Sequence, residues 1–156
     1  EITHAAETTA ATMVIYISIC NGVGRLFWAW LSDLITRRWV FLTMFLLQAI
    51  VFYFMPRAKD FTMLAGLMMV VGLCYGGGFG TMPAFAADYF GPKNAGKVYG
   101  LMLTAWSASG VLGPMLIARV KDKTGGYDKA LAVIPVLMIL SAILPLIARP
   151  PKKTSE

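Results

Sequence analysis

The residue best suited to bind a ligand is Arg25, the one charged residue in an apolar run from Ala11 to Ser32. Its planar guanidinium group can donate two parallel hydrogen bonds to a carboxylate. Asn21, one helical turn earlier, would lie on the same face and could add a polar contact. We therefore interpret Arg25 and Asn21 as candidate anion-binding residues. The alternative is that Arg25 extends toward the end of its helix or pairs with Asp33.

The apolar runs of the chain lack the side chains that most catalytic sites need. They contain no Asp, Glu or His, so they offer no acid–base pair, no metal-binding cluster and no internal proton relay. Cys20 and Cys74 stand in different runs and match no metal-ligand spacing, and His4 is isolated in a polar leader. The sequence therefore predicts that the chain is not an enzyme and binds no metal or cofactor.

The composition indicates the kind of fold that must position Arg25. Apolar residues make up 58% of the chain and charged residues 14%, whereas soluble domains average roughly 45–50% and about 25%. Five apolar runs are long enough, or nearly so, to cross a hydrocarbon core of about 30 Å as helices. They lack the alternation of barrel strands, so we predict an all-α polytopic membrane protein. Its transmembrane helices are expected at residues 11–32, 39–55, 61–85, 98–118 and 130–148, with a polar tail at 149–156.

Cationic residues gather between these runs. The net charge of +6 therefore indicates contact with lipid headgroups, and no nucleic-acid partner is predicted. Lys and Arg are divided almost equally between the two sides of the membrane, so their distribution does not determine the orientation. The longest connections are expected at residues 86–97 and 119–129, too short for an extramembrane domain. Such short connections predict that consecutive helices are antiparallel neighbours.

The third run is rich in glycine. It does not match a phosphate-binding loop, because its glycines lie within an apolar span and no Lys-Ser or Lys-Thr follows them. We predict instead a close approach to another helix, with a kink at Pro83. Glycine-broken helices also line transporter sites, which makes Tyr75 and Phe79 candidate cavity residues. The glycines are Gly72, Gly76, Gly77, Gly78 and Gly80.

The fourth run carries small residues at every fourth position, which predicts a packing stripe. Trp106 and Ser109 form a neighbouring face with an aromatic wall and a hydroxyl, for which core packing is the alternative role. Tryptophans in the first two runs are expected in an aromatic belt at the membrane surface. The stripe consists of Gly96, Gly100, Thr104 and Ala108, and the belt of Trp28, Trp30 and Trp39.

The stretch from Gly24 to Arg38 reads GRLFWAWLSDLITRR and resembles the signature loop of the major facilitator superfamily. Asp33, Arg37 and Arg38 match its Gly-x-x-x-Asp-Arg-x-Gly-Arg-Arg pattern. The chain departs from that pattern at Ala29, Leu34 and Thr36, which replace a glycine, a basic residue and a second glycine. The resemblance implies a cytoplasmic loop that helps to latch one conformation of a transporter.

A second stretch, from Gly80 to Gly100, is similar to the oxalate/formate antiporter family within that superfamily. It carries the family's Gly-Thr pair with Pro83 two residues on, then Tyr-Phe-Gly, Asn-x-x-Lys and Tyr-Gly. The resemblance implies that the five runs are helices eight to twelve of a twelve-helix transporter. The chain would then form most of a C-terminal half, and its partner would be the missing N-terminal half.

The same resemblance suggests roles for three residues. Arg25 matches an arginine that engages a substrate carboxylate, and Trp106 matches a cavity-lining aromatic residue. Ser109 stands where oxalate-handling members place a lysine, which favours a monocarboxylate such as formate, lactate or pyruvate. The expected function is secondary transport by alternating access across the cytoplasmic (inner) membrane, with a proton or counter-anion. The alternative is a stand-alone five-helix membrane protein that binds a protein partner and has no substrate.

Overall fold

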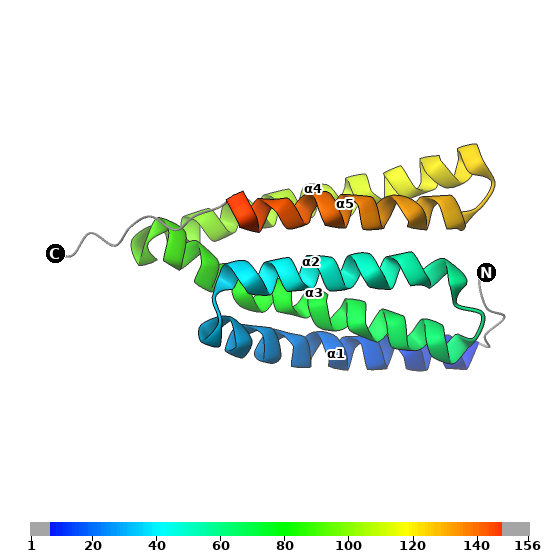
Figure 1. Cartoon of the computed structure of the whole chain (residues 1–156), viewed down its shortest axis with the longest axis horizontal. Helices are drawn as coiled ribbons and strands as arrows, with labels where there is room; N and C mark the ends of the chain where they lie inside the picture. Colours follow the sequence, from blue (N-terminus) through cyan, green and yellow to red (C-terminus); the bar gives the residue numbers. More distant parts are fainter. Residues whose placement is uncertain (1–6, 148–156) are drawn as a thin grey trace.

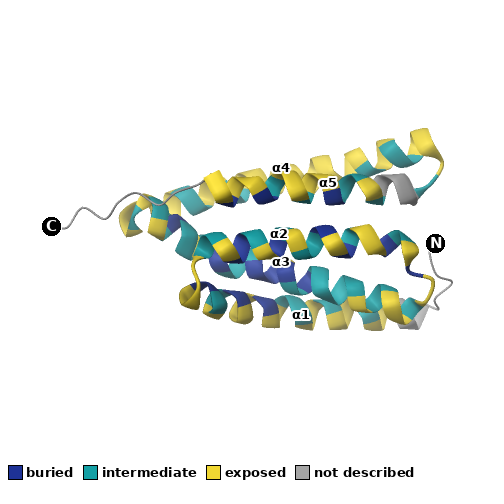
Figure 2. Ribbon diagram, viewed as in Figure 1, coloured by how far each residue is buried: buried dark blue, intermediate teal, exposed yellow. Residues whose placement is uncertain are grey.

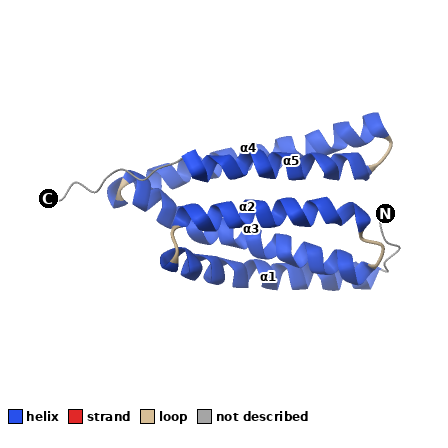
Figure 3. Ribbon diagram, viewed as in Figure 1, coloured by secondary structure: helices blue, strands red, loops and turns tan. Residues whose placement is uncertain are grey.

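The computed structural model of the chain describes residues 7–147, with side chains described at 11–126 and 131–147. The described residues form five α-helices and one short 3-10 helix, without strands (Figure 3), which confirms the all-α prediction. The tail predicted at 149–156 and the leader residue His4 lie outside the described residues. The helices are α1 (Glu7–Leu34), α2 (Arg37–Phe54), η1 (Met55–Arg57), α3 (Phe61–Phe90), α4 (Pro92–Thr124) and α5 (Tyr127–Ile147).

Four helical segments are long and apolar enough to cross a membrane. They are Ala11–Leu34, Arg37–Arg57, Phe61–Phe90 and Pro92–Thr124, and the shorter apolar segment Leu131–Ile147 lies in α5. Their outward surfaces are apolar as well, since large hydrophobic side chains such as Leu26, Leu101 and Ile147 are mostly exposed. A surface of this kind is stable in lipid rather than in water. The chain is therefore a multi-pass membrane protein.

The order of the helices in space differs from their order in the sequence. The most extensive contacts join α1 to α3 and α2 to α5, whereas α1 and α2 touch only weakly. Figure 1 shows α2 and α3 in the middle of the bundle, with α1 on one side and the α4–α5 pair on the other. The prediction that consecutive helices are neighbours is therefore only partly right, because a short connection does not require two helices to pack along their length.

The polar stretches predicted as connections are mostly helical. Gly91 alone separates α3 from α4, and its φ of 80° gives a backbone conformation that suits glycine. Gly125, with a φ of 77°, ends α4, and its N–H donates to the Lys121 carbonyl. The connections expected at 86–97 and 119–129 are therefore wrong in extent. A helix can continue through polar residues into the interfacial region, and it ends where the backbone conformation changes.

Glycines of α3 allow α1 to approach it closely. A Cβ added at Gly76 would lie 2.0 Å from the Asn21 carbonyl oxygen, and one added at Gly80 would lie 2.4 Å from that of Arg25. Gly72 meets Ile17 one turn earlier in the same register. The predicted close approach is confirmed. It places the backbone of both candidate anion-binding residues, Asn21 and Arg25 of α1, directly against α3. The helix continues through Pro83.

The described core lies where α1, α2 and α3 meet (Figure 2). Trp28 is 3% exposed and packs over Gly77, so its expected place in an aromatic belt is wrong. Trp30 and Trp39 are more than half exposed. A side chain facing the bundle can be buried even near a helix end, which the sequence position alone does not reveal. Other residues of the core are Val40, Phe41, Met44 and Cys74.

Helix α4 contributes none of its residues to the buried set. A Cβ added at Gly96 or Gly100 would meet nothing within 4 Å, in contrast to Gly72, Gly76 and Gly80 of α3. The packing stripe predicted along α4 is therefore not used within the described chain. Small residues permit a close approach, but a second helix must be present for them to make it.

Candidate functional site

The structure brings four of the predicted site residues together across three helices. The Arg25 guanidinium carbon of α1 lies 5.7 Å from the centroid of the Phe79 ring of α3. Phe79 meets the ring of Trp106 of α4 edge to face, with 5.3 Å between centroids. The indole N–H of Trp106 donates a 2.9 Å hydrogen bond to the hydroxyl of Tyr75, whose ring lies 5.3 Å from Phe79. We call Tyr75, Phe79 and Trp106 the aromatic cluster.

Arg25 has little compensation for its charge. Its one recorded hydrogen bond is from Nε to the side-chain oxygen of Asn21, at 3.4 Å, which is too long to be strong. The alternative pairing with Asp33 is wrong, because Asp33 binds Arg37 instead. Within the part of the chain that the structure describes, both recorded salt bridges belong to Arg37. Arg25 therefore presents an exposed cation beside an aromatic wall.

Ser109 contacts this group through Trp106. Its hydroxyl donates a 2.7 Å hydrogen bond to the Trp106 carbonyl one turn earlier. Both residues line a cavity of about 620 Å³ between α2, α3, α4 and α5. The six predicted ligand-site residues thus fall into a part around Arg25 and a part at this cavity, with Trp106 belonging to both.

An ionic cluster ties the ends of α1, α2 and α3 together. Arg37, the first residue of α2, donates from Nε to Asp88 of α3 at 3.0 Å and from Nη1 to both Asp33 and Ser32 of α1. The predicted pair of Asp33 and Arg37 is thus in contact. Arg38 takes no part in it, and its guanidinium lies 5.6 Å from the Trp39 ring.

Sequence reasoning missed Asp88 as a member of this cluster. Asp88 is as far from Asp33 in sequence as Gly80 is from Arg25 and Gly76 is from Asn21, so one helix register aligns all three pairs. The close glycine contacts therefore bring two carboxylates to the same level, where Arg37 compensates their charges. The signal that could have identified Asp88 is the register in which the glycines of α3 pack against α1.

Thr36, the residue directly before Arg37, has a strained backbone conformation. Its φ of 148° and ψ of 146° lie in a region that glycine adopts readily and other residues avoid at a cost of about 1–3 kcal/mol. The signature loop has a glycine at this position. We expect Thr36→Gly to raise the free energy of unfolding in detergent by about 1 kcal/mol, measured by thermal melting.

Thr36→Ala is the matched control for that substitution. The Thr36 side chain makes no capping hydrogen bond, so its loss alone should cost little. Alanine keeps the Cβ that makes this conformation unfavourable, and it should not stabilise the protein. Equal melting temperatures for the two variants would contradict the assignment of strain to this residue.

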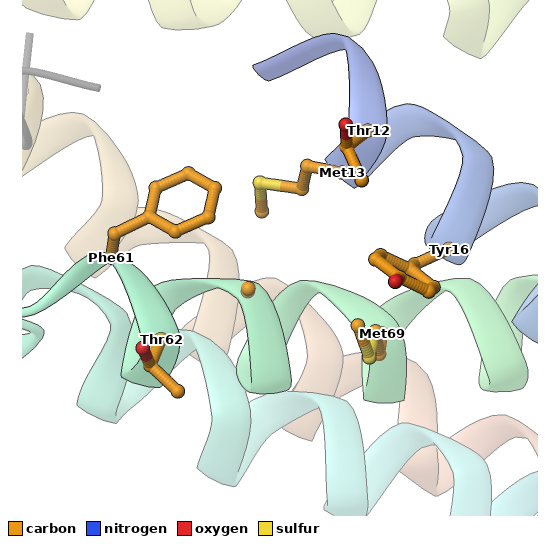
Figure 4. Close-up of a pocket in the computed structure, with 7 residues that line it drawn as sticks. Thr12, Met13, Tyr16, Phe61, Thr62 and Met69 are labelled. Atoms are coloured by element: carbon orange, nitrogen blue, oxygen red, sulfur yellow. The ribbon is translucent and has the colours of Figure 1, made fainter. Parts of the chain in front are cut away.

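A second hollow lies between α1 and α3 at the opposite end from Arg37. It has a volume of about 380 Å³, and Figure 4 shows Met13 and Tyr16 of α1 facing Phe61 and Met69 of α3 across it. No charged side chain and none of the predicted site residues line it. This hollow therefore offers a ligand no charged group from its described lining residues.

Apolar helices of membrane length, one of which holds Arg25 beside an aromatic cluster and without a salt bridge to any described residue, are features found in polytopic membrane transporters. Comparison with known families agrees: the chain belongs to the Major Facilitator Superfamily, whose model matches residues 1–156. The predicted membership of this superfamily is thereby confirmed, and the relatives that the chain matches are named as carriers and transporters rather than enzymes. The finer resemblance to oxalate/formate antiporters stays a prediction.

Curated relatives have carrier and transporter names. Apicoplast pyruvate carrier 1 of Toxoplasma gondii is 30% identical over 152 residues, which cover 94% of this chain and 28% of the relative. Monocarboxylate transporter 10 of Rattus norvegicus is 30% identical over 128 residues, which cover 76% of this chain and 24% of the relative. Riboflavin transporter RibJ of Trypanosoma brucei brucei is 25% identical over 136 residues, which cover 86% of this chain and 25% of the relative. The chain spans about a quarter of the length of these relatives.

Proposed function

We propose that this chain is part of a secondary transporter for a monocarboxylate, and that Arg25 binds the carboxylate group. The observation that carries the proposal is the uncompensated Arg25 guanidinium beside Phe79 and within a chain of contacts to Trp106. An arginine in a membrane-spanning helix costs about 2.5–3.5 kcal/mol on insertion scales, so its retention calls for a role. The names of the pyruvate carrier and the monocarboxylate transporter agree with a carboxylate substrate.

The aromatic cluster would assist Arg25 in two ways. The rings of Phe79 and Trp106 lower the local polarity, which strengthens the attraction between a guanidinium and a carboxylate. The Tyr75 oxygen accepts its hydrogen bond from Trp106, which leaves the Tyr75 hydroxyl hydrogen free to donate to an anion. Asn21 offers a further polar contact on the face of Arg25.

We also propose that the chain supplies helices eight to twelve of the transporter and that an N-terminal half completes it. In that arrangement the ionic cluster of Asp33, Arg37 and Asp88 would lie at the cytoplasmic side of the cell's inner membrane and latch one conformation. Transport by alternating access would exchange the carboxylate for a counter-anion or move it with a proton.

The side chain at position 109 should decide between monocarboxylates and dicarboxylates. In the full-length transporter, Ser109→Lys would add a second cation at the cavity beyond Trp106, and a dianion such as oxalate could then be bound at both ends. We expect the ratio of oxalate to formate uptake into proteoliposomes to rise at least tenfold.

Ser107→Lys serves as the control, because Ser107 is exposed on the same helix and does not line the cavity. It should leave the oxalate-to-formate ratio within about twofold of the wild-type ratio. An unchanged ratio in Ser109→Lys, or an equal rise in both variants, would count against a specific role for position 109.

A further inference from the structure

The cavity lined by Trp106 and Ser109 has the size of a ligand site but no charged residue in its described lining. Its volume of about 620 Å³ falls in the range of roughly 300–1,000 Å³ for small-molecule sites. Four helices line it, with Phe41 from α2, Met82 and Phe85 from α3, Trp106 from α4 and Leu144 from α5 among the lining residues. No Asp, Glu, Lys or Arg lines it, so a carboxylate would not be bound within it.

The polar groups at this cavity are largely satisfied within the protein. The Ser109 hydroxyl donates to the Trp106 carbonyl, and the Trp106 indole N–H donates to Tyr75. Ser141 of α5 is the other residue with a polar side chain in the lining. No hydrogen bond of the Ser141 hydroxyl to a described residue is seen, so an apolar group that filled this space would leave one donor at its edge unpaired, and it would gain the free energy of leaving water.

The cavity adjoins the candidate anion site through one side chain. Trp106 lines the cavity and also meets the ring of Phe79, which in turn lies against the Arg25 guanidinium. A ligand anchored by its charge at Arg25 therefore has an apolar volume next to the aromatic cluster. Formate and oxalate have no apolar body and would leave that volume unused.

We propose that the transported monocarboxylate carries an apolar body of branched-chain or aromatic size, and that this body occupies the cavity while the carboxylate binds Arg25. The inference rests on the proposed function. It assigns substrate selectivity to residues that Arg25 does not touch, among them Phe41, Met82 and Ser141.

A series of 2-oxo acids tests this assignment in proteoliposomes containing the full-length transporter. Pyruvate, 4-methyl-2-oxopentanoate and phenylpyruvate share the same charged end and differ in their apolar bodies. Each buried methylene adds about fourfold in affinity, so the inhibition constants against labelled pyruvate uptake should fall at least tenfold from pyruvate to the larger acids. Equal constants across the series would overturn the inference, as expected if a lipid acyl chain fills the cavity.

Ser141→Leu would fill part of the cavity and supplies a second test. We expect it to reduce the preference for phenylpyruvate over pyruvate at least tenfold, whereas Ser107→Leu, the same change outside the cavity, should not. An equal effect of both variants would overturn the inference. If substitution of Arg25 changes the uptake of none of these acids, the proposed function itself is wrong. If uptake depends on Arg25 but not on the size of the apolar body, the proposed function stands and this inference is wrong.

Discussion

Arg25→Lys is expected to lower kcat/KM for carboxylate uptake at least tenfold while the protein still inserts and folds. Lysine keeps the positive charge, but it lacks the planar pair of donors that matches a carboxylate. Lysine also does not reproduce the cation–π contact in which the guanidinium carbon lies 5.7 Å from the centroid of the Phe79 ring. Initial rates of labelled pyruvate uptake into proteoliposomes, over a range of concentrations, give kcat/KM directly.

Arg119→Lys is the matched control, because Arg119 is an exposed residue of α4 that lines neither recorded cavity. It should retain wild-type uptake within about twofold. If Arg25→Lys transports as well as this control, Arg25 does not bind the substrate, and the alternative of a membrane protein without a carboxylate substrate gains support.

Gly76→Ala is expected to destabilise the bundle by about 1–3 kcal/mol or more. The added methyl would lie 2.0 Å from the Asn21 carbonyl oxygen, and a backbone atom cannot move aside as a flexible side chain can. Helix α1 must then shift away from α3, which disturbs both Asn21 and the ionic cluster at the helix ends. Thermal unfolding in detergent can be followed with a thiol-reactive dye, since Cys74 is 1% exposed in the folded protein.

Gly78→Ala, two residues further along α3, is the control for this experiment. A Cβ there meets nothing within 4 Å, and alanine favours a helix more than glycine does, so the melting temperature should stay the same or rise slightly. If Gly76→Ala has the same melting temperature as Gly78→Ala, the close contact between α1 and α3 is not a determinant of stability. A loss of uptake in Gly76→Ala without loss of stability would instead locate its effect at Asn21.

The sequence predicted the class of fold well because the bilayer imposes strong constraints. The long apolar runs, one of which contains Arg25, predict helices, because a helix in lipid can hydrogen-bond its backbone N–H and C=O groups within the same segment. The glycines of α3 correctly predicted close packing, since only small side chains allow such an approach. The helix boundaries were less accurate, because polar residues near Gly91 and Gly125 do not by themselves end a helix.

The partners of the candidate site residues depended on tertiary structure. Sequence spacing left Arg25 free to pair with Asp33, whereas the folded chain gives Asp33 to Arg37 and sets Arg25 against Phe79. The same spacing placed Trp28 in a surface belt, although it packs over Gly77 in the core. In each case a residue on another helix or connection decided the outcome.

The sequence by itself determined that this chain is a helical membrane protein with one cation inside its apolar runs. Local composition is sufficient for that conclusion, because lipid acts on each segment separately. Only the tertiary structure decided that Phe79 lies beside Arg25 and against Trp106, that Asp88 joins the ionic cluster, and that an apolar cavity adjoins Trp106. These contacts join different helices, and their register is set by backbone approach between helices distant in the sequence.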